Sequence, residues 1–208
     1  PKTFFETEMR FSNVVWAFPD LAFVTEGSSR TTQTRTWVLN PAKPAAARKL
    51  WERSREDRYS NPGGFVTVPH PDEPRTVPLR SPDGRWLYLS GEGASPEGEK
   101  PFLDRLDVST LKTERLWQSA PPHFERLVDV LDPQAQRIII TRESPTQWPD
   151  YFLHDRQAGK DVRRMTEFPD PSPWFSQVKG ELIQYKREDG IDLSATLYLP
   201  PGYDAARD

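Results

Sequence analysis

The sequence predicts an all-β protein, a partial β-propeller of about three four-stranded antiparallel blades. Three observations support this prediction: a turn followed by a strand recurs along the chain, apolar and polar residues alternate after each turn, and 22 prolines are spread over the whole length. Distributed prolines interrupt helices and separate many short elements. Four short strands repeated about every 45 to 50 residues are typical of a propeller blade.

The turns show the repeat most clearly. Residues 81–89 read SPDGRWLYL, residues 132–140 read DPQAQRIII one unit later, and FPDLAFV at 18–24 is a third copy. Pro82 presets φ at the second position of a type I turn, and Gly84 accepts the left-handed position that lets the hairpin continue. Each copy is therefore expected to be a turn that leads into a buried strand.

Each turn and its strand are flanked by further candidate strands, one before and two after. The preceding strands are NVVWAF, RTVPLRS and ERLVDVLD, and the following pairs are TRTWVLNP with RKLWERS, FLDRLDVST with TERLWQS, and YFLHDRQAG with DVRRMTEF. Four strands per unit predict blades over residues 11–54, 75–119 and 124–168, within a propeller segment that covers residues 1–168.

Residues 45–57 are ambiguous. The string AAARKLWERSRED is rich in residues of high helix propensity, and Pro44 suits the first turn of a helix. The register of the repeat favours a strand instead, because the Leu-Trp pair at 50–51 falls where the Leu-Trp pair falls at 116–117. We expect a strand here, with a helix as the alternative.

The long segments sort onto one face of the predicted blades. Residues 25–33, 91–101 and 143–150 connect the second and third strands of their units, and the longest insertion, residues 55–74, connects the first blade to the second. Elaborated loops on one side of a rigid scaffold commonly carry function. We expect this face to meet a partner domain or a substrate, and tolerated surface insertion is the alternative.

The pattern changes at Pro169. Residues 169–180 read as a proline-rich linker, and residues 181–208 read as two strands joined by a tight turn at 188–190. Apolar and polar residues alternate from 191 to 199, as in a half-buried strand. We therefore expect a second domain to begin in this segment.

The same C-terminal residues carry a resemblance to a known family. YKREDGIDLSATLYLPPGYD at 185–204 resembles the segment that opens the α/β-hydrolase domain of the prolyl oligopeptidase family of serine peptidases, where that domain follows a propeller. DRYSNPG at 57–63 and ESPTQWPDYFLHD at 143–155 resemble its glutamyl-endopeptidase-like branch. The resemblance runs from residue 11 to residue 208. It implies serine-type cleavage of short peptides, with the propeller gating a buried triad and forming part of the pocket, and it implies a peptide substrate and a hydrolase domain as partners.

The sequence departs from this family at the catalytic centre. It contains no G-x-S-x-G nucleophile elbow, so no residue is assigned as catalytic and the chain is expected to lack the triad of its parent peptidase. The residues His70, His123 and His154 are more typical of structural or solvated histidines, and their spacing lacks the close pair of a zinc site. We expect no metal and no cofactor.

Two arginines are the candidate substrate-binding residues. If the branch assignment holds, acidic substrate side chains need a guanidinium, which binds a carboxylate through two parallel hydrogen bonds. Arg58 lies in the longest insertion, and Arg142 ends a strand just before a connection. The alternative for each is an ion pair at the surface or between blades.

Bulk composition excludes several partners. The net charge of −3 and the pI near 5.7 supply no basic surface for nucleic acid. No run of 18 apolar residues indicates a membrane span. The chain is expected to be soluble, and composition leaves open whether it is cytoplasmic or periplasmic.

A stand-alone propeller that binds a protein or glycan through its loop-rich face is the alternative function. Three blades do not close a ring, which ordinarily takes about four to eight. We therefore expect apolar blade faces to be exposed, and the fragment either to self-associate or to be completed by segments outside this sequence.

Overall fold

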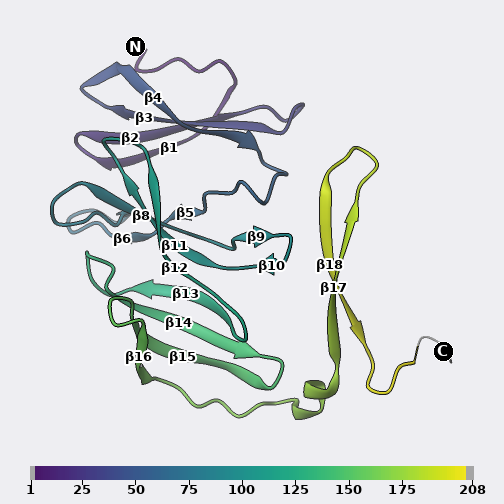
Figure 1. Cartoon of the computed structure of the whole chain (residues 1–208). Helices are drawn as coiled ribbons and strands as arrows, with labels where there is room; N and C mark the ends of the chain where they lie inside the picture. Colours follow the sequence, from purple (N-terminus) through teal and green to yellow (C-terminus); the bar gives the residue numbers. More distant parts are fainter. Residues whose placement is uncertain (1–2, 205–208) are drawn as a thin grey trace. The chain divides into compact units, whose positions relative to one another are not determined.

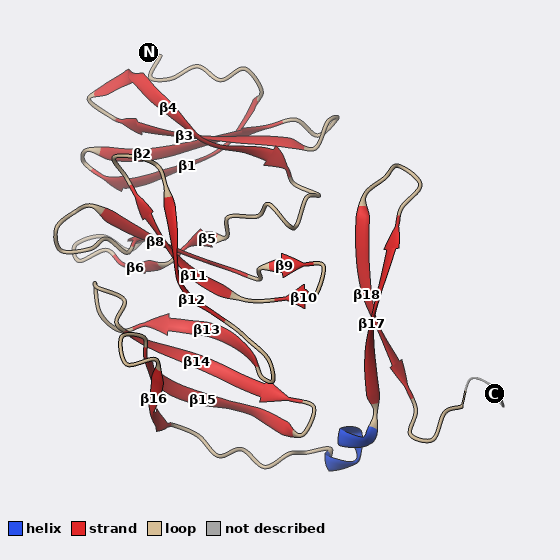
Figure 2. Ribbon diagram, in the orientation of Figure 1, coloured by secondary structure: helices blue, strands red, loops and turns tan. Residues whose placement is uncertain are grey.

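The structure is a computed structural model that describes residues 3–204. Residues 1–2 and 205–208, the outer ends of the predicted propeller and hydrolase segments, lie outside the described residues. Strands dominate the described range, with one short 3-10 helix (Figure 2). Three four-stranded sheets are present, each with the strand connectivity of a propeller blade (Figure 1). The predicted all-β fold class is confirmed.

The chain folds into two compact units. The first comprises the chain up to Gly91 together with Leu103–Arg115, and the second comprises Glu92–Phe102 and the chain from Leu116 onward. No helix in residues 3–204 has the length and apolar character needed to cross a membrane.

The first sheet is a four-stranded meander in which sequential strands are neighbours. Its antiparallel strands, in the order β1-β2-β3-β4, are Arg10–Phe18, Leu21–Gly27, Gln33–Asn40 and Lys43–Ser54. The strands β2 and β3 extend into residues 25–33, so the expected connection between them shrinks to residues 28–32.

The ambiguous residues 45–57 form a strand up to Ser54. This confirms the expected strand over the alternative helix. Pairing with β3 skips Leu50, because Thr36 lies opposite Trp51 while Trp37 lies opposite Lys49. A bulge of this kind lets two consecutive residues turn toward one side, and both Leu50 and Trp51 pack on the same apolar cluster. Tertiary packing of this pair thus outweighs the helix propensity of the segment.

The second sheet departs from the prediction at its first strand. Its order is β12-β11-β8-β5, with bounds Thr113–Gln118, Phe102–Asp107, Trp86–Gly91 and Gly64–Phe65. The strand β5 comes from the insertion at 55–74 and pairs with β8. The expected strand RTVPLRS instead forms β7 (Thr76–Pro78), which pairs with β6 (Thr67–Pro69). It meets β8 through one antiparallel bridge, between Arg80 and Leu87. Pro78 has no amide hydrogen to donate, which suits β7 to an edge position.

The third sheet runs in the order β13-β14-β15-β16, with bounds Phe124–Val130, Arg137–Ser144, Gln147–Asp155 and Lys160–Arg164. The expected connection at 143–150 is mostly strand, since β14 and β15 stay paired out to Ser144 and Gln147. Residues 91–101 also fold in part, as a small hairpin of β9 (Ala94–Ser95) and β10 (Gly98–Glu99). Loop lengths read from polarity were therefore too long.

The turns predicted in residues 81–89 and 132–140 form as expected. Gly84 adopts φ +72° and its amide donates to the carbonyl of Ser81 over 2.9 Å. In the related turn Ala135 takes the left-handed position at φ +52°, although it is not glycine. The carboxylate of Asp132 accepts hydrogen bonds from three later amides of that turn and supports this conformation.

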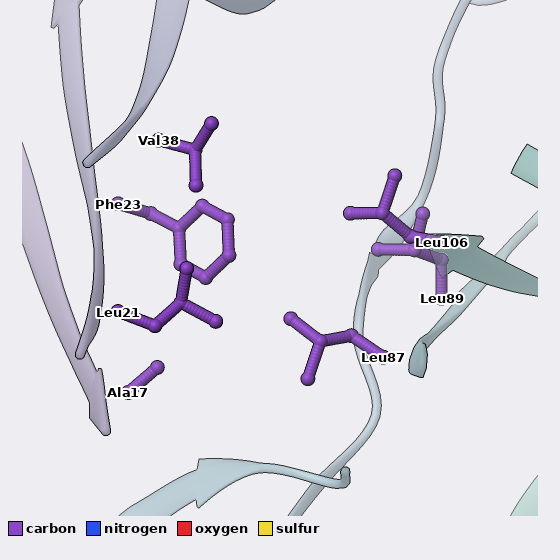
Figure 3. Packing of buried hydrophobic residues seen from close by; sticks show 7 residues of the cluster. All are labelled: Ala17, Leu21, Phe23, Val38, Leu87, Leu89 and Leu106. Carbon is purple, nitrogen blue, oxygen red and sulfur yellow. The ribbon is translucent and has the colours of Figure 1, made fainter. Parts of the chain in front are cut away.

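A shared apolar cluster packs β1–β4 against β8 and β11. Figure 3 shows Phe23 and Val38 of the first sheet facing Leu87, Leu89 and Leu106 of the second. All of these side chains are at most 4% exposed. Burial of apolar area, at about 25 cal/mol per Å², makes this cluster stabilise the first unit.

A separate hairpin follows the third sheet. The 3-10 helix Pro173–Gln177 precedes β17 (Lys179–Lys186) and β18 (Asp192–Leu199), which pair only with each other among the described strands (Figure 1). Gly190, at φ +87°, closes the turn by donating its amide to the Arg187 carbonyl. The two strands and the tight turn expected at 188–190 are present.

Candidate functional site

The candidate residue Arg142 lies on β14 and crosses the face of the third sheet. Its Nε lies 2.5 Å from Oε1 of Glu125 on β13, and its two terminal nitrogens lie 2.6 and 3.1 Å from the carboxylate of Asp161 on β16. The guanidinium stacks 4.5 Å above the ring of Phe152 on β15. One side chain therefore touches residues from all the other strands of its sheet.

His154 completes this cluster. Its Nδ1 lies 3.0 Å from Oδ1 of Asp161. Burial raises the pKa of the Asp161 carboxyl, but the hydrogen bonds from Arg142 and His154 outweigh it and hold the pKa below its usual value. The Arg142 side chain is only 17% exposed. A substrate carboxylate at Arg142 must therefore join or replace Asp161, and the role of Arg142 in substrate binding stays a prediction.

The second candidate, Arg58, lies in an exposed loop that hydrogen bonds hold in shape. Oδ1 of Asp57 accepts hydrogen bonds from the amides of Tyr59 and Ser60 at 3.1 and 3.2 Å. The pKa of the Asp57 carboxyl is lowered, first by a hydrogen bond from the Ser60 side chain and then by the bond from the Ser60 amide. Arg58 and Tyr59, which is 42% exposed, therefore sit on an ordered loop.

Asn61 and Gly63, which follow Arg58, hold this loop in place within the first unit. Oδ1 of Asn61 accepts from the amide of Gly63 at 3.1 Å and from Arg53 at 3.2 Å. Gly63 adopts φ +80°, and a Cβ there would lie 2.3 Å from the Ser90 carbonyl oxygen. The string DRYSNPG thus encodes a backbone shape that needs glycine at its end.

Arg58 lies in the first compact unit and Arg142 lies in the second.

Within residues 3–204 no histidine ring nitrogen bonds a serine hydroxyl. His70 accepts from the amide of Asp72, His154 bonds Asp161, and Nδ1 of His123 is buried without a hydrogen-bond partner in the described range. The described groups of His, Asp and Glu include none suited to hold a metal ion.

Sequence reasoning missed several buried carboxylates, among them Asp150 and Glu26. Asp150, 1% exposed, accepts from Thr166 Oγ1, the Phe168 amide and Arg164, and so fixes the segment after β16 to β15. Glu26, fully buried, accepts from the Met9 amide at 2.6 Å. A charged residue within an otherwise apolar run, such as LAFVTEG, is the signal that could have indicated Glu26.

Comparison with known proteins finds relatives that match the whole of this chain. Curated relatives include two proteins named "Probable glutamyl endopeptidase, chloroplastic", from Arabidopsis thaliana and Oryza sativa subsp. japonica, each 35% identical over the whole of this chain. This chain is similar over its whole length to these probable glutamyl endopeptidases. The chain spans 23% of the length of each of these two relatives. No protein-family model matches the sequence.

Solved structures that align with this chain include oligopeptidase B from Trypanosoma brucei, with 13% identity and a TM-score of 0.44 over 94% of this chain and 33% of the other. The β-propeller domain of the Trilobed protease from Pyrococcus furiosus aligns with 12% identity and a TM-score of 0.38, over 93% of this chain and 55% of the other.

Proposed function

We propose that this chain is the non-catalytic propeller portion of a prolyl-oligopeptidase-like serine peptidase, where it gates access to the peptide site and forms part of it. The observation that carries the proposal is the match, over the full chain, to proteins named as probable glutamyl endopeptidases. The sequence supplies blades and no nucleophile elbow. The catalytic residues then belong to a partner domain, and the peptide is the substrate.

The domain arrangement is part of this proposal: propeller over residues 1–168, linker over 169–180, and the first strands of a hydrolase domain over 181–208. The hairpin β17–β18 supports it, because a two-stranded sheet is marginal alone in water. Its exposed apolar side chains lie on both strands and include Leu182, Ile183, Tyr185, Leu197 and Tyr198. Such a hairpin gains stability by packing into a larger domain.

Arg58 is proposed to bind acidic side chains of the peptide. The loop is ordered by Asp57 and Asn61, so little entropy is lost when the loop engages a ligand. Arg142 is proposed in the same role, with its guanidinium already oriented by Glu125 and Asp161. Orientation of a guanidinium favours two-bond contact with a carboxylate, while the existing pairs compete with it.

The test uses the full-length natural protein and two matched peptides, one with Glu and one with Gln before the scissile bond. A fluorophosphonate probe should label a serine, and Arg58→Ala should lower kcat/KM for the Glu peptide about tenfold while leaving the Gln peptide unchanged. Arg30→Ala, at another exposed arginine, is the control.

Arg142→Ala is tested by the same ratio, because a loss of folded protein lowers both rates equally. An unchanged Glu-to-Gln ratio in both variants would remove the arginines from the proposal and leave the peptidase assignment intact. Absence of serine labelling would overturn the peptidase assignment itself and favour a stand-alone binding propeller.

A further inference from the structure

A cleft in the first unit lies outside the candidate site described above. It has a volume of about 680 Å³, within the size range of small-ligand sites, and is lined by β1, β5, β6, β7 and the segment that joins β6 to β7. Trp16, which is 47% exposed, contributes from β1, and Phe65 and Pro78 contribute apolar surface opposite. The cleft is therefore an accessible hollow beside the outer edge of β1.

The hydrogen bond of Arg75 reveals how that edge is oriented. Nη1 of Arg75 donates to the carbonyl oxygen of Trp16 over 2.6 Å. This carbonyl therefore points away from β2, so Trp16 belongs to a non-hydrogen-bonded pair of the antiparallel ladder. Val14, two residues earlier in the unbroken register Val14–Trp16, is oriented in the same way. The amides of both residues face outward.

These outward amides take no part in the ladder between β1 and β2. In residues 3–204 neither the Val14 nor the Trp16 amide donates to another residue. Unpaired backbone groups along a strand edge are a template for another extended chain. Because Val14 and Trp16 both line the cleft, the available donors lie where a ligand would fit.

The polar wall of the cleft suits a neutral polypeptide backbone. Arg75 also bonds Glu73 through Nε at 2.5 Å, and this contact lowers the pKa of the Glu73 carboxyl. The opposite charges largely cancel. Nη2 of Arg75 has no hydrogen-bond partner in the part of the chain that the structure describes, so it is a donor suited to a peptide carbonyl.

We propose that the cleft binds an extended peptide segment with apolar side chains, which adds as a strand to the outer edge of β1. The Val14 and Trp16 amides donate to its carbonyls, and its side chains contact Trp16 and Pro78. Strand addition gives affinity through main-chain hydrogen bonds and selectivity through alternate side chains. This binding site is separate from Arg58 and Arg142 and requires no catalysis.

Peptide backbone methylation tests the proposal on the unaltered protein. The probe is a fluorescent, blocked heptapeptide of alternating Val and Thr, compared with two versions methylated on the odd or on the even backbone nitrogens. One strand edge of the peptide faces β1, so one methylated version should bind about tenfold more weakly and the other should bind like the parent. Equal binding of all three, or no binding of the parent peptide, would overturn the proposal.

Two protein variants locate the site. Val14→Pro removes an outward amide that takes no part in the β1–β2 ladder, and Val14→Ala keeps that amide. Peptide affinity should fall about tenfold for Val14→Pro and less than about threefold for Val14→Ala. Equal affinity of both would contradict binding at this edge. Light scattering could instead show a dimer that prevents peptide binding and that does not form in the Val14→Pro variant. In that case the ligand of this edge would be a second copy of the chain and not a peptide.

Discussion

Arg142 and Asp161 are joined by two parallel hydrogen bonds although a whole strand, β15, separates their strands in the sheet. The pair closes over the ring of Phe152, and Glu125 holds the third side of the guanidinium. A planar guanidinium is suited to such a bridge because its donors are fixed in one fork. This arrangement makes the charged cluster a crosslink of the third sheet, whatever it does for a substrate.

Removing this crosslink should destabilise the protein. Arg142→Ala leaves the carboxylates of Glu125 and Asp161 partly buried without their partner, and we expect the free energy of unfolding to fall by about 2 kcal/mol or more. Arg126→Ala on the same sheet is the control, because its ion pair with Glu143 is exposed and should contribute less than about 1 kcal/mol. Urea unfolding measures both. Equal losses would show that Arg142 is no more than a surface ion pair.

The loop that carries Arg58 should depend on Gly63. Gly63→Ala places a Cβ 2.3 Å from the Ser90 carbonyl oxygen in a left-handed conformation, so we expect a loss of about 2 to 4 kcal/mol. Gly159→Ala is a matched control, since Gly159 adopts φ +61° with open space around its Cα. It should cost only about 1 kcal/mol of backbone strain. Thermal unfolding that ranks the two variants equally would contradict the close approach at Gly63.

The N-terminal segment should depend on Glu26. Glu26→Ala removes the acceptor of the Met9 amide and of Trp37 Nε1, which lie 2.6 and 2.7 Å from its carboxylate. Unpaired buried donors cost about 1 to 3 kcal/mol each, so the segment before β1 should detach more often. Limited trypsin cleavage after Arg10, followed by mass spectrometry, should accelerate. Glu8→Ala, at a 79% exposed side chain, should change the cleavage rate little, and the reverse ranking would refute the anchor.

Stability should fall in acid. The hydrogen bond from Arg35, followed by that from Lys49, lowers the pKa of Glu52 from 4.5 to about 2. The pKa values of Asp150 and Asp161 are also lowered, because their hydrogen bonds outweigh burial. The native state therefore binds protons less readily than the unfolded chain, so stability is fully present above the unfolded pKa and is lost as pH falls toward the folded pKa.

The measurement is the urea midpoint between about pH 6 and pH 2. We expect little change from these groups above about pH 5 and a steady decline below it. Glu52→Gln should flatten part of the decline. A midpoint that rises on acidification would show that the carboxylates are not stabilising in the native state.

Much of the fold could be predicted because its signals are local. The turn at Ser81–Gly84 follows from Pro and Gly chemistry, and the hairpin around Gly190 follows in the same way. The first strand of the second sheet could not be predicted, because the choice between residues 64–65 and RTVPLRS depends on which segment meets β8 in space. Connections also looked longer than they are, since polar residues continue paired strands at exposed sheet ends.

The candidate site was less predictable than the fold. The sequence indicated Arg58 and Arg142 from charge and position, but the partners of Arg142 come from β13 and β16, and no spacing rule links three strands. The burial of Asp150 and Glu26 was equally unpredictable, because it depends on hydrogen-bond donors that lie far away in the sequence.

The sequence by itself determined the class of structure: repeated turns, alternating strands and scattered prolines restrict each segment to short strands, because these preferences act over a few residues. Tertiary structure alone decided that Arg142 is a crosslink and that the outer edge of β1 faces a cleft. Those outcomes depend on packing and hydrogen bonds between residues far apart in the chain, whose energies exceed the local propensities they override.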